Sequence, residues 1–162
     1  GYTHADRLAL LDAIGDLLQG LLPRYRALAA RGQIELSSTP HAHPIAPLLL
    51  DFNAAREAWP DAPLPLSPCY PGGRDRLDLH VTRALASHRA RFGAAPAGLW
   101  PAEGAVSAAA LARFAEHGVG WAATGEAVLA NTLGAGHYVR ERDLYRPWRD
   151  PSGVSLCFRD DR

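Results

Sequence analysis

Residues 98–107 read Gly-Leu-Trp-Pro-Ala-Glu-Gly-Ala-Val-Ser and carry more information than any other stretch of the chain. Glu103 follows a short apolar run and precedes a predicted helix start at Ser107. In parallel α/β proteins, such strand-to-helix junctions carry the catalytic side chains. Trp100 adds a flat apolar face that suits stacking against a sugar ring. The stretch suggests a carbohydrate-active site, but on these residues alone a glutamate that merely caps the next helix is the stronger interpretation.

Composition indicates a globular chain with no electrostatic signal for a polyanionic partner. The chain has 162 residues, of which 48% are hydrophobic and 21% charged, which is enough for one domain with a real core. Seventeen basic and seventeen acidic residues cancel, which argues against nucleic acid or an anionic membrane as partner. We expect no signal peptide and no membrane span, because no apolar run approaches about 20 residues.

The two cysteines indicate the cellular compartment in which the protein is found. Cys69 and Cys157 are far apart and form no C-x-x-C motif, so they do not indicate a metal or redox centre. We expect two buried free thiols, which fits a reducing cytoplasm.

Hydrophobic periodicity predicts alternating helices and strands. Helices are predicted over 4–31, 44–59, 74–92 and 107–117, with a helical turn at 126–131, and Pro23 is predicted to kink or divide the first helix near Gly20. Strands are predicted over 33–38, 97–100, 119–123 and 154–158, and the proline-rich residues 60–73 are predicted to be a loop. This alternation favours an α/β fold with a parallel sheet and right-handed crossovers.

Four parallel strands are too few for a complete fold of this kind. A closed barrel needs about eight strands and an open doubly wound sheet about five or six. We therefore interpret residues 1–162 as a fragment of a single larger catalytic domain, with a complete small domain as the alternative. Open sheet edges and uncovered apolar surface would then favour self-association of the excised chain.

Polar and ionisable residues collect at the carboxyl ends of the predicted strands. They include His41 and His43 after the first strand, Trp100 and Glu103 after the second, Thr124 and Glu126 after the third, and Arg159, Asp160 and Asp161 after the fourth. Glu35 lies inside the first strand, where it would face either a polar interior or solvent. His41 and His43 could share a zinc ion with Asp160 or Asp161, but recognition of a substrate hydroxyl is the favoured interpretation.

Three motifs carry a family resemblance. The segment Gly32-Gln33-Ile34-Glu35-Leu36, continuing through Thr39-Pro40 to His43-Pro44-Ile45, resembles the second conserved region of glycoside hydrolase family 57. Residues 98–107 resemble that family's third region, and Phe158-Arg159-Asp160 resembles a later Phe-Arg-Asp stretch. Their order and approximate spacing also match.

The resemblance implies a fold, an activity and roles for residues. It implies part of a (β/α)7 barrel that cleaves or transfers α-linked glucans with retention of configuration, as in α-amylases and 4-α-glucanotransferases, without a metal or other cofactor. Glu103 would be the catalytic nucleophile. Trp100 would line the sugar subsite, with His43 and Glu35 near it. From their places after predicted strands, His41, Arg159 and Asp160 are further candidate substrate-binding residues.

Departures from the family pattern limit these expectations. The family's opening His-Gln-Pro region and the region that supplies the acid/base aspartate are absent, so we expect the isolated chain to hydrolyse nothing. Asp160 and Asp161 do not match that aspartate's motif, and Gly125 stands where relatives commonly carry Asp. Two alternatives remain: a metal-dependent polysaccharide deacetylase, and a carbohydrate-binding module that stacks sugars on Trp100, Trp121 and Trp148.

Overall fold

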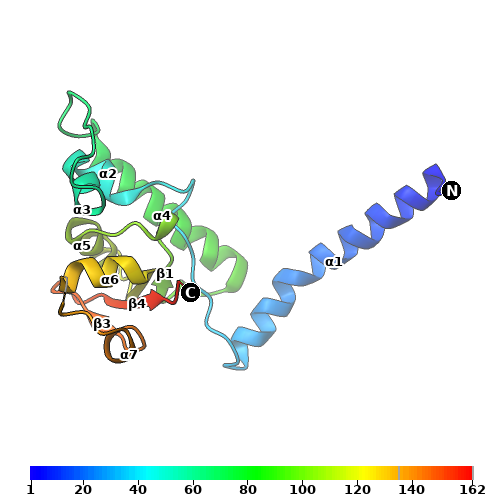
Figure 1. Ribbon diagram of the computed structural model, residues 1–162. Helices are drawn as coiled ribbons and strands as arrows, with labels where there is room; N and C mark the ends of the chain where they lie inside the picture. Colours follow the sequence, from blue (N-terminus) through cyan, green and yellow to red (C-terminus); the bar gives the residue numbers. More distant parts are fainter. Residues whose placement is uncertain (135, 162) are drawn as a thin grey trace.

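A four-stranded sheet with the order β1-β2-β4-β3 lies at the centre of the computed structural model, which describes residues 1–134 and 136–161 (Figure 1). The strands are β1 (Gly98–Leu99), β2 (Trp121–Gly125), β3 (Trp148–Arg149) and β4 (Ser155–Arg159). β1, β2 and β4 run parallel, as the sequence predicts, with β2 in the middle. Their carboxyl ends therefore lie at one edge of the sheet.

The prediction of a purely parallel sheet is wrong at β3, which pairs antiparallel with β4. The two strands are joined by a tight turn in which the Gly153 N–H donates to the Asp150 carbonyl at 2.8 Å. Gly153 adopts a left-handed conformation with φ of 91°, which glycine tolerates at no steric cost. Such a short connection can only join antiparallel strands, so the sheet is mixed.

Seven helices and two 3-10 turns are seen in the residues that the structure describes. They are α1 (His4–Ala30), α2 (Ala46–Leu50), η1 (Phe52–Ala54), α3 (Ala55–Ala58), α4 (Gly73–Phe92), η2 (Ala102–Gly104), α5 (Ala108–Glu116), α6 (Glu126–Leu133) and α7 (Arg140–Asp143). The predicted helices over 74–92 and 107–117 are confirmed within a residue or two, as is the loop over 60–73. Neither α7 nor β3 was predicted.

The hydrophobic core lies between the sheet and helices α4 and α5. Leu77 and Val81 of α4 are four residues apart and share one helix face, and both are fully buried. Phe114 of α5 and Leu99 of β1 are also completely buried in the same cluster. This core fixes the end of β1, and with it the segment that carries Glu103.

Helix α1 extends away from the body (Figure 1), and none of its residues is buried. The predicted capping box at Thr3 and Asp6 is present. The predicted division near Gly20 is wrong, because the helix runs through Pro23 without a break. Proline removes one backbone N–H, and Gln19, whose carbonyl loses that partner, is exposed to water.

The segment 33–38 runs beside β1 but does not form the predicted strand. Its pairing is one parallel bridge, in which the Trp100 N–H donates to the Ser38 carbonyl at 2.7 Å and the Ser38 N–H to the Gly98 carbonyl at 3.3 Å. β1 ends at once because Pro101 follows Trp100 and has no N–H to continue a ladder. In this parallel register residues 33–37 lie opposite residues 94–98, mostly ahead of β1, where Pro96 has no N–H to donate, so no ladder forms there.

The predicted helix over 44–59 is broken into α2, η1 and α3. Asp51 adopts an extended conformation, and its carboxylate accepts a hydrogen bond from the Asn53 N–H at 2.8 Å. Aspartate side chains compete with helical backbone hydrogen bonds in this way. The break turns the chain and places α3 beside the Glu103 segment.

The cysteine prediction is half right. Cys69 and Cys157 are unpaired, as expected, but both are exposed and not buried. Cys69 lies in the proline-rich surface loop, and Cys157 lies on the less buried face of β4. Across the described part of the chain, no helix combines the length and the hydropathy needed to cross a membrane.

Candidate active site

The turn after β1 holds Glu103 in a strained conformation. Glu103 has φ of 56°, and Gly104, the next residue, has φ of 67°. A non-glycine residue in this left-handed region costs about 1–2 kcal/mol. The surrounding backbone is buried, since Pro101, Ala102 and Gly104 are inaccessible, whereas the Glu103 side chain is 74% exposed. The fold thus forces one carboxylate outward from a rigid turn, and strain of this kind clusters at functional sites.

A second strained turn brings His43 to this carboxylate. In the described residues, the non-glycine positions with positive φ are Ala42, His43 and Glu103. The Nε2 atom of His43 lies 3.8 Å from Oε1 of Glu103. The turn is fixed to helix α4, because the His41 N–H donates to the His80 carbonyl at 3.0 Å. In the described part of the chain, all three non-glycine residues with left-handed backbone conformations therefore lie around the Glu103 carboxylate.

A hollow of about 640 Å³ opens beside Glu103. It lies between the α2–α3 segment, the Glu103 turn and helix α6, and aliphatic side chains such as Leu48, Val106 and Val128 form most of its wall. Polar groups are contributed by Asn131, among others. A volume of this size falls in the range of ligand-binding pockets.

Trp100 also lies beside this turn, and Arg159 from β4 covers part of its ring. The Arg159 guanidinium carbon is 5.8 Å from the ring centroid, a distance at which the cation is attracted to the aromatic face. Arg159 Nε also donates to Asp161 Oδ1 at 2.6 Å. The predicted substrate residues Trp100 and Arg159 are therefore in contact with each other.

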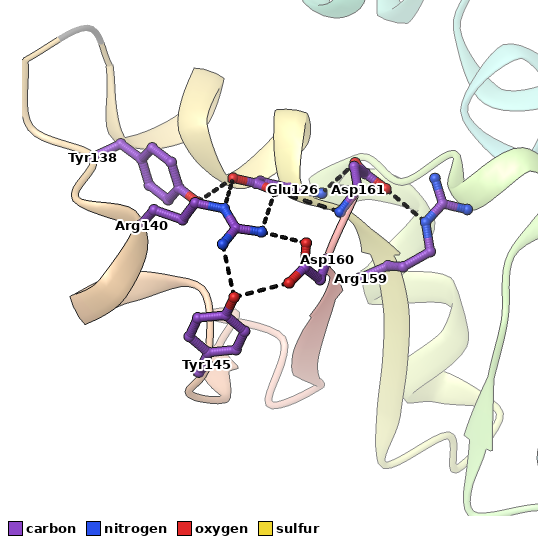
Figure 2. A network of polar contacts seen from close by, with 7 residues as sticks. All are labelled: Glu126, Tyr138, Arg140, Tyr145, Arg159, Asp160 and Asp161. Carbon is purple, nitrogen blue, oxygen red and sulfur yellow. Dashed lines mark hydrogen bonds and ion pairs between the residues drawn. The ribbon is translucent and has the colours of Figure 1, made fainter.

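A polar network joins the ends of β2 and β4 to the segment around α7 (Figure 2). The Glu126 N–H donates to Asp161 Oδ2 at 3.0 Å. The Glu126 carboxylate accepts hydrogen bonds from Tyr138 at 2.8 Å and from Arg140 Nε at 2.9 Å. The bonds from Arg140 and then from Tyr138 hold the pKa of Glu126 below its ordinary value. Burial, and then the bond to Glu126, raises the pKa of Tyr138 to about 12.

The same network engages Asp160. Arg140 forms an ion pair with Asp160, and the Tyr145 hydroxyl donates to Asp160 Oδ2 at 2.8 Å (Figure 2). Arg140 also donates to the Tyr145 oxygen at 2.8 Å. The network fixes the residue that follows β4 and holds it against the α7 segment.

The remaining predicted residues lie in other contacts. Glu35 is exposed, and its carboxylate accepts a hydrogen bond from the Trp121 indole N–H at 2.6 Å. The ring of His41 stacks on that of His80 at 6.3 Å between centroids. Of the predicted substrate residues, the structure therefore brings His43 to Glu103, and places Glu35 and His41 against other partners.

The two alternative functions depend on a metal site and on exposed tryptophan faces. Within residues 1–134 and 136–161, no three His, Cys, Asp or Glu side chains are grouped so that they could hold a metal ion. Trp121 packs over Gly98, and Trp148 lies under the Arg146 guanidinium, 4.2 Å from its ring centroid. Trp148 also donates its indole N–H to the Asp143 carbonyl at 2.9 Å.

Fold and site together define an α/β protein whose candidate functional residues lie at the carboxyl ends of parallel strands. The chain belongs to glycosyl hydrolase family 57, whose sequence model matches residues 10–162. No curated protein matches the chain.

Two crystal structures have a similar fold. They are the novel α-amylase AmyC from Thermotoga maritima, with a TM-score of 0.62 and 16% identity over 94% of this chain, and the GH57-type branching enzyme from the hyperthermophilic archaeon Pyrococcus horikoshii, with a TM-score of 0.61 and 13% identity over 93%. The chain spans 24% and 26% of the lengths of these two proteins.

Sequence reasoning missed the partners that hold the site together. Arg140, Tyr138 and Tyr145 follow no predicted strand and carry no motif, so nothing in the sequence connects them to Glu126 or Asp160. Thr124 was recognised as a polar residue at a strand end, but its partner was not. The available signal was a threonine directly after an apolar predicted strand, at residues 119–123.

Proposed function

We propose that this chain forms part of a (β/α)7 barrel catalytic domain in a retaining glycoside hydrolase or glucanotransferase that acts on α-linked glucans. The observation that carries the proposal is Glu103, an exposed carboxylate held in a strained turn at the carboxyl end of β1. Family membership over residues 10–162 supports the reaction class. The similar folds of an α-amylase and a branching enzyme support α-glucans as substrates.

In the proposed mechanism Glu103 attacks the anomeric carbon of the substrate. The attack forms a covalent glycosyl-enzyme intermediate, which water hydrolyses or an acceptor sugar intercepts, and configuration is retained. A second carboxyl group about 5–5.5 Å away must protonate the leaving oxygen and later activate the acceptor. The family resemblance assigns this role to an aspartate in a region that residues 1–162 do not contain. Asp160 and Asp161 are engaged by Arg140 and Arg159 instead.

The neighbouring side chains take supporting roles in this proposal. His43 faces Glu103 at 3.8 Å and would bind a sugar hydroxyl next to the reacting bond. Trp100 would stack against a sugar ring on the face that Arg159 leaves free, and Arg159 would contact a substrate group at the edge of the indole. Glu35, His41 and Asp160 would then act through the residues that they hold. No metal or other cofactor is required by a mechanism of this kind.

Two further parts of the proposal concern the isolated chain. It should hydrolyse no maltooligosaccharide, because it lacks the acid/base aspartate, and detectable turnover would contradict this. It should also self-associate, since large apolar side chains along α1, such as Leu10, Leu11 and Leu17, are exposed. Monodisperse monomers in light scattering would count against that. The two free thiols support a cytoplasmic location, which cell fractionation can test.

Mechanism-based labelling tests the central proposal. The whole protein that carries this chain is incubated with an activated fluoroglucosyl reagent, and the peptides are mapped by mass spectrometry. We expect a sugar adduct on Glu103, no adduct in Glu103→Gln, and normal labelling in Glu116→Gln, a control at the C-terminal end of α5 that contacts Arg113. A folded protein that is labelled elsewhere, or that keeps full activity as Glu103→Gln, refutes the assignment of Glu103. Retained sugar binding without turnover would instead support a binding module.

A further inference from the structure

The turn that carries Glu103 is held mainly by its own backbone. The Gly104 N–H donates to the Pro101 carbonyl at 2.9 Å, and the Ala105 N–H donates to the Ala102 carbonyl at 3.0 Å. These bonds close the turn on itself but do not attach it to the sheet. The position of Glu103 relative to the strands therefore depends on what else contacts the turn.

Thr124 provides such an attachment. Its hydroxyl donates to the carbonyl oxygen of Gly104 at 2.5 Å, and the residue is completely buried. Gly104 also lies next to Thr124, since a Cβ at Gly104 would be in ordinary contact, 3.6 Å from the Thr124 Cα and Oγ1 atoms. A buried carbonyl and a buried hydroxyl thus satisfy each other at the residue next to Glu103.

Strand geometry explains why position 124 is suited to this. Ala122 pairs with Leu99, the last residue of β1, and Thr124 lies two residues further along the same strand. Continuing this register places Thr124 beside the chain two residues beyond Leu99, where it leaves β1. The side chains of Ala122 and Thr124 point to the same face, because residues two apart on a strand do so. On its other side Thr124 is paired with Phe158 of β4. The β-branched side chain has few rotamers, which fixes the direction of the hydroxyl.

We propose that Thr124 is a positioning residue for the reaction, and that its hydroxyl sets where the strained Glu103 turn lies above the sheet. This inference rests on the proposed function of Glu103 as nucleophile. Thr124 does not touch the substrate in this arrangement. It acts through the Gly104 carbonyl, one peptide unit from the reacting carboxylate.

The test compares Thr124→Val with Thr124→Ser in the whole protein. Valine keeps the shape of threonine but leaves the Gly104 carbonyl without its donor, whereas serine keeps the hydroxyl. Displacement of a reacting group by about 1 Å can cost 100-fold in rate, so we expect valine to lower kcat about 10- to 100-fold with little change in KM. Serine should restore most of the rate. Hydrogen exchange of the peptide that covers residues 98–107 should accelerate in the valine variant and not in the serine variant.

The outcomes separate this inference from the proposed function. A valine variant with unchanged kcat and unchanged exchange refutes the positioning role, as does a serine variant that is as slow as valine. An equal loss of thermal stability in both variants, without a kcat difference between them, indicates a purely structural threonine and also refutes it. If Glu103→Gln remains active, the proposed function fails, and the exchange measurement still decides whether Thr124 holds the turn.

Discussion

Replacing Gly98 by alanine should destabilise the protein, because the indole of Trp121 lies directly over this glycine. A Cβ at position 98 would lie 2.0 Å from Trp121 Cε2 and 2.1 Å from Cδ2, where ordinary contacts begin at 3.4 Å. The ring would have to retreat by about 1.4 Å, an overpacking that costs about 1–3 kcal/mol. The same movement breaks the Trp121 hydrogen bond to Glu35, which is worth about 0.5–1.5 kcal/mol. We expect a total loss of about 2–4 kcal/mol.

Urea unfolding followed by far-ultraviolet circular dichroism measures this loss without depending on the displaced indole. The matched control is Gly20→Ala in α1, where a new Cβ meets nothing within 4 Å and should stabilise the helix by about 0.5–1 kcal/mol. In a Trp121→Ala background, Gly98→Ala should cost less than about 0.5 kcal/mol, because the obstacle is gone. An undiminished cost in that background, or a Gly98→Ala variant as stable as the original, would refute the reasoning.

Three other predictions follow from the strain, the titration and the core. Glu103→Gly relieves the left-handed strain and should raise the free energy of unfolding by about 1 kcal/mol in urea titration while abolishing glucan turnover; a less stable variant would contradict the strain argument. Tyr138 has a folded-state pKa of about 12 against an ordinary 10.0, so its contribution to stability is complete below pH 10 and is lost as pH rises through 12. Tyrosinate absorbance should show this late titration, and should show it shifted toward the ordinary value in Glu126→Gln. Phe114→Ala should cost about 3–5 kcal/mol in calorimetry, whereas Leu79→Ala, on the exposed side of α4, should cost less than about 0.5 kcal/mol.

The parts of the fold that periodicity could predict are those whose neighbours lie close in sequence or on one helix face. Helix α4 shows this, because Leu77 and Val81 repeat at the spacing of a single buried stripe. Helix α5 starts at Ser107, whose side chain accepts a hydrogen bond from the Ala110 N–H, as its residue type indicates. These signals lie within a few residues of one another in the sequence, so they can be recognised without knowing how the sheet is arranged.

The parts that could not be predicted depend on contacts between distant segments. The segment 33–38 has the pattern of a strand, but in its parallel register it lies opposite residues ahead of β1, where Pro96 interrupts the ladder. Helix α1 has the apolar residues of a buried amphipathic helix, yet all of its residues remain accessible. The spacing of apolar residues shows which face of a helix could be buried, but it does not show whether another part of the protein packs against that face.

The candidate site divides in the same way. Glu103 was predicted from its place between an apolar run and a helix start, and the structure shows it exposed on a strained turn. The approach of His43 to Glu103 was expected from their places after two predicted parallel strands, whose carboxyl ends meet at one edge of a sheet, and from the family resemblance. The engagement of Asp160 by Arg140 and Tyr145 could not be predicted, since it depends on α7 and on the turn that precedes β4.

The short strand β3 constrains how the sheet can grow beyond β4. It pairs with Ser155 and Leu156 only, in the part of the chain that the structure describes, so the same side of β4 remains open from Cys157 to Arg159. A further parallel strand that joined β4 directly would have to begin its pairing two residues later than β2 does on the other side. Closed barrels require such a progressive offset between neighbouring strands. In the barrel proposed above, the hairpin would therefore set the stagger of the next strand, and with it the tilt of the strands around the barrel axis.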